Sequence, residues 1–142
     1  MKQFDVLVVD DEAEFRDLTV KILNKRGINA RGAESGEQAM EILRHALIDV
    51  VLLDVKMPGI DGIETLRQIR IQNPLVEVVL LTGHASVESG IEGMKLGAFD
   101  YLMKPIELDP LLEKLSFAYE KKRLHQEKIE LAQMKKHMAM PS

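Results

Sequence analysis

Short apolar runs alternate along the chain with longer segments in which apolar residues recur every three or four positions. An uninterrupted apolar run bounded by turn residues is typical of a strand that is buried on both faces of a sheet. The clearest run, at residues 50–53, ends in Asp54 and is followed closely by a Pro-Gly turn. Strands are therefore expected at residues 4–9, 28–33, 49–54, 76–81 and 98–103. The second run is the least apolar, which favours a place nearer an edge of the sheet.

The segments between these runs have the spacing of amphipathic helices, and several begin with a residue that caps helices. Ser35 and Gln38 form the Ser-x-x-Gln pattern of a capping box. Asp61 and Ser86 stand at the start of two later segments, where their side chains can cap a helix in the same way. A fifth helix is expected to begin near residue 107.

Strands that alternate regularly with helices predict an α/β fold with a parallel sheet covered on both faces. Five strands and five helices fit a single doubly wound domain. By analogy with known doubly wound folds, the strand order is expected to be 2-1-3-4-5.

Composition narrows the class of protein. The chain has 142 residues and no cysteine, so disulfides, thiolate catalysis and zinc-thiolate sites are excluded. No apolar run approaches the length of a membrane span, which favours a soluble, cytoplasmic protein with no membrane partner. The net charge is −8 over residues 1–120 and +4 over residues 121–142. An acidic body is unsuited to direct nucleic-acid binding, which needs clustered cationic charge.

Residues 121–142 are expected to form a helical extension or linker beyond a domain at residues 1–120. No Gly or Pro interrupts the good helix formers up to residue 138, so the last helix is expected to continue past the domain. Apolar residues recur every seven positions at Phe117, Leu124, Leu131 and Met138. The second seam that a coiled coil needs is mostly Glu and Lys. A homodimer through this helix and a solvated linker both remain open.

The expected strand ends deliver polar residues to one edge of the sheet. The first strand is followed by Asp10 and Asp11, the third ends in Asp54, the fourth ends at Thr82, and the fifth at Lys104. In the expected strand order these four strands are neighbours, so the side chains should surround one crevice. Three carboxylates in one crevice could repel by about 10 kcal/mol, and one lysine cannot neutralise them. An all-oxygen site of this kind suits Mg²⁺ or Mn²⁺.

A divalent cation, a lysine and a hydroxyl group together form a receptor for a phosphoryl group. The cation and Lys104 would neutralise phosphoryl oxygens, and Thr82 would donate a hydrogen bond to one of them. Asp54 would attack phosphorus as a carboxylate nucleophile and form an acyl phosphate. No general base is needed, because a carboxylate is already ionised at neutral pH.

The same residues belong to motifs that occur in a fixed order. They are Asp10-Asp11 after the first strand, Asp54 in the string Asp-Val-Lys-Met-Pro-Gly-Ile-Asp-Gly, Thr82-Gly83, and Phe-Asp-Tyr-Leu-Met-Lys-Pro at residues 99–105. With these motifs, residues 4 to about 120 resemble the receiver (response regulator) domain of bacterial two-component signalling. The resemblance implies that Asp54 is the phosphoacceptor and that Asp10, Asp11 and the backbone carbonyl of Lys56 complete a Mg²⁺ site with it. It also implies that Lys104 pairs with the phosphoryl group or with Asp54, and that the peptide bond after Lys104 is cis.

The resemblance further implies a switch. Thr82 would move toward the phosphoryl group, and Tyr101 would fill the space that it leaves, which changes the face of the fourth helix, fifth strand and fifth helix. Without the resemblance, Tyr101 would be a core or edge aromatic residue. Lys56 and His84 each lie two residues beyond a site residue and are expected to set the lifetime of the phosphorylated state. Otherwise His84 is a loop residue.

The implied function is a signalling switch and not an enzyme with a free substrate. A sensor histidine kinase or phosphotransfer protein would donate the phosphoryl group, and an output protein or domain would respond. The chain could be a stand-alone receiver or the amino-terminal receiver of a longer regulator. An aspartyl phosphohydrolase is a third possibility, but that class places Asp-x-Asp after its first strand, where this chain has adjacent Asp10-Asp11.

Overall fold

A computed structural model describes residues 3–56, 61–83 and 87–138. Five parallel strands form one sheet in the order β2-β1-β3-β4-β5. The strands are β1 (Asp5–Val9), β2 (Asn29–Ala33), β3 (Val50–Asp54), β4 (Glu77–Thr82) and β5 (Asp100–Met103). The predicted fold class and strand order are confirmed, and β2 lies at an edge of the sheet as expected.

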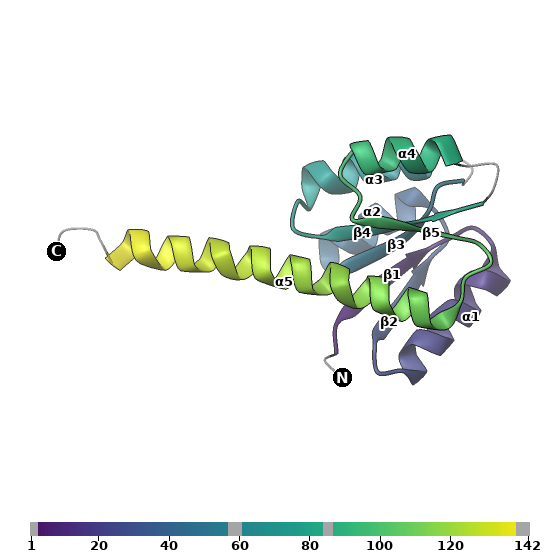
Figure 1. The fold of residues 1–142 in the computed structure, drawn as a ribbon, viewed down its shortest axis with the longest axis horizontal. Coiled ribbons are helices and arrows are strands. Elements are labelled where there is room, and N and C mark those ends of the chain that lie inside the picture. Colours follow the sequence, from purple (N-terminus) through teal and green to yellow (C-terminus); the bar gives the residue numbers. More distant parts are fainter. Residues whose placement is uncertain (1–2, 57–60, 84–86, 139–142) are drawn as a thin grey trace.

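The described helices cover both faces of this sheet (Figure 1). They are α1 (Ala13–Lys25), α2 (Gly36–His45), α3 (Gly62–Gln72), α4 (Val87–Lys95) and α5 (Leu108–Met138). Helices α1 and α5 pack on one face, and α2 and α3 pack on the other with α4 beside α3. None of the helices in the described ranges has the length and apolarity that crossing a membrane requires.

The core has two layers because successive side chains of a strand point to opposite faces. On β1, Leu7 and Val9 belong to the cluster beneath α2 and α3. Val6 and Val8 belong to the cluster beneath α1 and α5. All four side chains are fully buried, so the apolar run encodes a strand covered on both sides.

The predicted strands begin one or two residues too early. Phe4, Ile28, Val76 and Ala98 were expected in strands but lie just before β1, β2, β4 and β5. All four are buried in the core. The apolar pattern reports burial, and burial here extends beyond the residues whose backbones pair in the sheet.

Helix caps follow the sequence pattern at two of the predicted sites. The Ser35 hydroxyl accepts a hydrogen bond from the Gln38 backbone N–H (3.1 Å), and Asp61 caps α3 in the same way. The Gln38 side chain accepts from the backbone N–H of Glu34 (2.7 Å) rather than from that of Ser35, so the capping box is shifted by one residue. The predicted cap at Ser86 lies outside the described residues.

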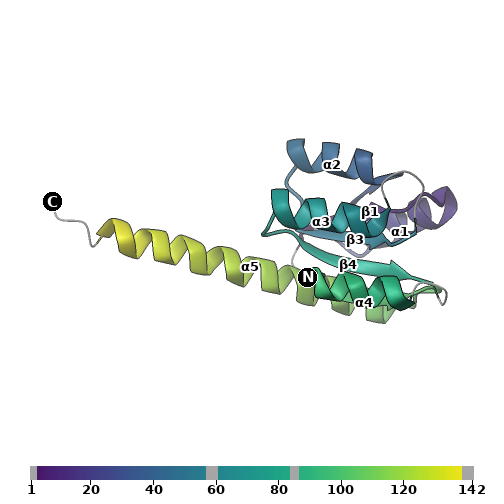
Figure 2. The same ribbon diagram turned by 90° about the horizontal axis from the view of Figure 1, so that it is seen from above.

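Helix α5 continues without a break past residue 120 and projects far beyond the sheet, as Figures 1 and 2 show. Leu111, Leu115 and Ala118 are its buried residues. Where the helix leaves the sheet, the Tyr119 ring stacks on Phe4 with the ring centroids 4.6 Å apart. The extended last helix is therefore confirmed. The apolar residues spaced by seven positions along it are exposed: Phe117, Leu124, Leu131 and Met138.

Candidate functional site

The carboxyl ends of β1, β3 and β5 bring two carboxylates and a lysine together. Asp10 follows β1, Asp54 is the last residue of β3, and Lys104 follows β5. Backbone hydrogen bonds continue beyond the strand ends and fix these positions, from Asp10 N–H to Ala33 (3.1 Å) and from Lys104 N–H to Thr82 (2.8 Å). The peptide bond between Lys104 and Pro105 is cis.

Lys104 is the centre of the charge arrangement. Its Nζ lies 2.8 Å from Asp10 Oδ2, 3.0 Å from Glu12 Oε1 and 3.6 Å from Asp54 Oδ2. The ammonium also lies 4.3 Å from the centroid of the Phe15 ring, a cation–π contact. Among the described residues, Lys104 is the one cation that pairs with these carboxylates.

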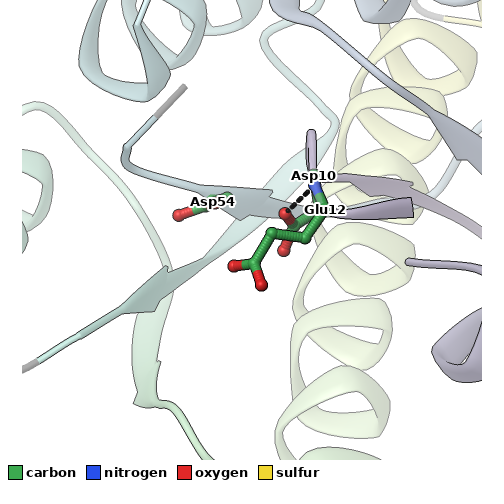
Figure 3. Close-up of side chains that lie close together, drawn as sticks. All are labelled: Asp10, Glu12 and Asp54. Atoms are coloured by element: carbon green, nitrogen blue, oxygen red, sulfur yellow. Dashed lines mark hydrogen bonds between the residues drawn. The ribbon is translucent and has the colours of Figure 1, made fainter. Parts of the chain in front are cut away.

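The acidic cluster differs from the expected one in one member. Asp10, Glu12 and Asp54 each offer a carboxylate oxygen, and these oxygens lie within 4.8 Å of one another (Figure 3). Asp11 is exposed and is not part of this cluster. Sequence reasoning missed Glu12. A signal was present, because an Asp often accepts a hydrogen bond from the N–H two residues on, and Asp10 Oδ1 accepts from Glu12 N–H here (2.9 Å).

Burial and the neighbouring groups shift the pKa values of Asp54 and Lys104. Burial raises the pKa of Asp54 to about 6, and the nearby charge of Asp10 adds to this effect. The Lys56 backbone N–H and the Lys104 ammonium oppose the rise. Burial acts to lower the pKa of Lys104, but its hydrogen bonds to Asp10 and Glu12 outweigh that effect, so the pKa is raised. At neutral pH, Asp54 is therefore mainly ionised and Lys104 is a cation.

Thr82 and Tyr101 lie beside this crevice on neighbouring strands. The Thr82 side chain is buried, and its hydroxyl donates to the Leu102 carbonyl at 3.5 Å, toward β5. Tyr101 is 47% exposed. Both residues line a cavity of about 430 Å³ with Ile91 and Met94 of α4. The described structure thus places an exposed aromatic side chain next to open space that reaches Thr82.

The two residues expected to tune phosphoryl lifetime are placed unequally. Lys56 is exposed, and its backbone N–H donates to Asp54 Oδ1 (3.1 Å). His84 lies outside the described residues.

The donor chemistry of the cluster fits a divalent cation. Carboxylate oxygens are hard ligands of the kind that Mg²⁺ and Mn²⁺ prefer. Asp10 and Asp54 are buried, so their charges are poorly solvated, and the single lysine leaves excess negative charge in the crevice. Among the described side chains, the buried Asp10 and Asp54 would hold such a cation, and the exposed Glu12 lies beside them. Lys56 and Asp11 as ligands stay predictions.

A doubly wound sheet with an acidic crevice and a lysine at its carboxyl edge defines a class of domain that binds charged groups at strand ends. Residues 6–116 match the model of the response regulator receiver domain. The chain therefore belongs to the response regulator receiver domain family of two-component signalling.

Similar proteins agree with this assignment. The chain is 43% identical over 107 residues to the transcriptional regulatory protein ZraR of Escherichia coli K12. The matched residues cover 75% of this chain and 24% of ZraR. It is 38% identical over 133 residues to a putative NtrX-like response regulator of Rickettsia conorii, over 92% of this chain and 28% of that protein. The crystal structure of NtrX from Brucella abortus in complex with ADP superposes with a TM-score of 0.86 at 32% identity, over 92% of this chain and 30% of NtrX. The chain spans about a quarter of the length of the curated relatives it matches.

Proposed function

We propose that this receiver accepts a phosphoryl group on Asp54 from a sensor histidine kinase or a phosphotransfer protein. The observation that carries the proposal is the position of Asp54, a 7% exposed carboxylate at the crevice with the Lys104 ammonium 3.6 Å away. Asp54 is ionised at neutral pH and can act without a base. In this function the domain is a signalling switch and not an enzyme that turns over a free substrate.

The chemical step is a phosphoryl transfer between two side chains. An Asp54 oxygen forms a bond to phosphorus as the bond from phosphorus to the donor's histidine nitrogen breaks, and the electron pair of the broken bond stays on that nitrogen. Lys104 donates hydrogen bonds to a phosphoryl oxygen and neutralises part of its charge. Asp10 and Asp54, the buried members of the acidic cluster, would hold Mg²⁺ or Mn²⁺, which would supply the remaining charge neutralisation.

The signal then passes through Thr82 to the face formed by α4, β5 and α5. A phosphoryl group on Asp54 presents new acceptor oxygens, which compete with the Leu102 carbonyl for the Thr82 hydroxyl. Movement of Thr82 toward the phosphoryl group enlarges the adjacent cavity of about 430 Å³, and Tyr101 turns inward to fill it. An output partner that prefers one position of Tyr101 shifts the equilibrium.

We further propose that the chain is the receiver part of a longer regulator and that α5 is the linker toward an output domain. Two observations support this: the chain matches only about a quarter of each curated relative, and α5 continues well beyond the sheet. The curated relatives include a transcriptional regulatory protein, so an output on DNA is the proposed role of the remaining chain and not of this acidic receiver.

Intact-mass analysis with acetyl phosphate and Mg²⁺ tests the proposal. The unsubstituted chain should gain one phosphoryl group, and Asp54→Asn should gain none. Glu77→Gln is the matched control. Glu77 is also a buried carboxylate, but it lies at the start of β4, at the end of the sheet away from the crevice. It should take up the group normally. A folded, unsubstituted chain that gains no mass in the presence of Mg²⁺ contradicts the proposal.

A second assay separates the switch from a phosphohydrolase. Continuous release of phosphate from p-nitrophenyl phosphate, dependent on Asp54, would favour the hydrolase. We expect no turnover beyond the slow loss of phosphate from Asp54 itself.

A further inference from the structure

Glu12 stands at the amino-terminal cap position of α1 but does not cap the helix. Its side chain makes no capping hydrogen bond. Instead, Glu12 Oε1 accepts a hydrogen bond from Lys104 Nζ at 3.0 Å, across 92 residues of sequence. The side chain therefore spans the crevice from the β1 side to the residue that follows β5.

The Lys104 ammonium is held on the α1 side of the crevice. Its two hydrogen bonds go to Asp10 and Glu12, and the Phe15 ring of α1 lies against it. Asp54, at 3.6 Å, is beyond hydrogen-bond distance. The side chain of Glu12 is 66% exposed, whereas that of Asp10 is fully buried. Of the two hydrogen bonds, the one to Glu12 is the more easily exchanged.

We propose that Glu12 is a positioning residue that restrains Lys104 and thereby slows phosphoryl uptake by Asp54. The inference rests on the proposed function of Asp54. To bond a phosphoryl oxygen, Lys104 must move toward Asp54, and that movement breaks its hydrogen bond to Glu12. Glu12 thus stabilises the unphosphorylated arrangement and sets a threshold for phosphorylation.

The rate of phosphoryl uptake from acetyl phosphate at saturating Mg²⁺ tests this role. Glu12→Gln keeps the size of the side chain and removes its charge. We expect uptake to become about two- to fivefold faster, the range of an exposed ion pair. Glu14→Gln is the control, because Glu14 is exposed in the first turn of the same helix and makes no ion pair with a described residue. It should leave the rate unchanged.

The same pair of variants in a Lys104→Met background separates positioning from a general charge effect. If Glu12 acts through Lys104, Glu12→Gln should not accelerate uptake once Lys104 is replaced. The NMR signal of the Lys104 ammonium group gives a direct readout in the unphosphorylated protein. It should shift in Glu12→Gln and stay in place in Glu14→Gln.

The outcomes are distinguishable. If the unsubstituted chain takes up no phosphoryl group, the proposed function fails. If the unsubstituted chain does take up a phosphoryl group, but Glu12→Gln reacts at the same rate as Glu14→Gln, only the proposed role of Glu12 fails. Slower uptake in Glu12→Gln would show that Glu12 assists the reaction. Equal acceleration by Glu12→Gln in the Lys104→Met background would show that Glu12 acts through its charge alone and not through Lys104. Either result would overturn the restraint.

Discussion

The parallel strands begin at the amino edge of the sheet and end at its carboxyl edge. Both edges hold carboxylates beside lysines, but their charges are balanced differently. At the amino edge, Asp49 lies 2.9 Å from Lys122 and Glu77 lies 3.8 Å from Lys121, so each acid has its own lysine from α5. At the carboxyl edge, three carboxylates share Lys104. The amino edge is close to neutral, whereas the carboxyl edge carries excess negative charge.

The difference shows that burial of an acid does not by itself mark a site. Burial raises the pKa of Glu77, as it does that of Asp54, although the charge of Lys121 opposes the rise at Glu77. Glu77 is nevertheless only 1% exposed beneath α5. A site needs unbalanced charge together with access, and the carboxyl edge has both, since its cluster includes the 66% exposed Glu12 side chain.

Backbone crowding at the carboxyl edge gives the largest expected effect. A Cβ on Gly62 would lie 2.2 Å from the Asp54 carbonyl oxygen and 2.4 Å from Val55 Cα, and backbone atoms cannot move aside cheaply. Gly62→Ala should lower the free energy of unfolding by about 3–4 kcal/mol in urea titrations. Gly83→Ala is the control, because an added Cβ at this position of the same edge would meet no described residue beyond its chain neighbours within 4 Å. Equal stability of the two variants would contradict the crowding.

Removing the shared lysine tests the charge imbalance. Lys104→Met leaves three carboxylates without a cation, so we expect a loss of roughly 3 kcal/mol in metal-free urea unfolding. Mg²⁺ should restore most of that loss, because it would replace the missing positive charge. A loss that Mg²⁺ does not reduce would argue against a cation site at this edge.

The raised pKa of Asp54 predicts a pH dependence of stability. Since the folded state holds this proton up to about pH 6 and an unfolded Asp loses it near 3.8, the folded state binds more protons between these values. Stability should therefore fall as pH rises through this interval, and the cost persists above it. Asp54→Asn should remove this cost and stabilise the metal-free protein by about 3 kcal/mol near pH 8. Urea unfolding at about pH 4 and pH 8 measures the difference, which should nearly vanish at the lower pH.

The smallest effect is expected at the amino edge. Asp49 keeps a hydrogen bond from the Asp5 backbone N–H (2.8 Å) when Lys122 is removed, and its side chain still reaches solvent. Lys122→Met should therefore cost about 1 kcal/mol, and Mg²⁺ should not restore it. A loss as large as that of Lys104→Met, or one that Mg²⁺ reverses, would remove the distinction between the two edges.

Most of the fold was predictable from the sequence because local patterns encode it. The apolar runs specify buried strands, and Ser35 and Asp61 specify helix starts, whatever the rest of the chain does. The strand order, in contrast, was predicted by analogy with known doubly wound folds and not from the apolar pattern. The exact strand starts depended on backbone pairing, which leaves no mark in hydrophobicity at Phe4 or Ile28.

The sequence by itself determined that Asp10, Asp54, Thr82 and Lys104 stand at strand ends, because each follows or ends an apolar run. Only the tertiary structure decided which of them are in contact. Side-chain direction beyond a strand end depends on the local turn, and the turn at Asp10 places Glu12 rather than Asp11 beside Lys104. The distance from Lys104 to each carboxylate is set by segments about 50 to 90 residues apart in sequence, so no local pattern could give it.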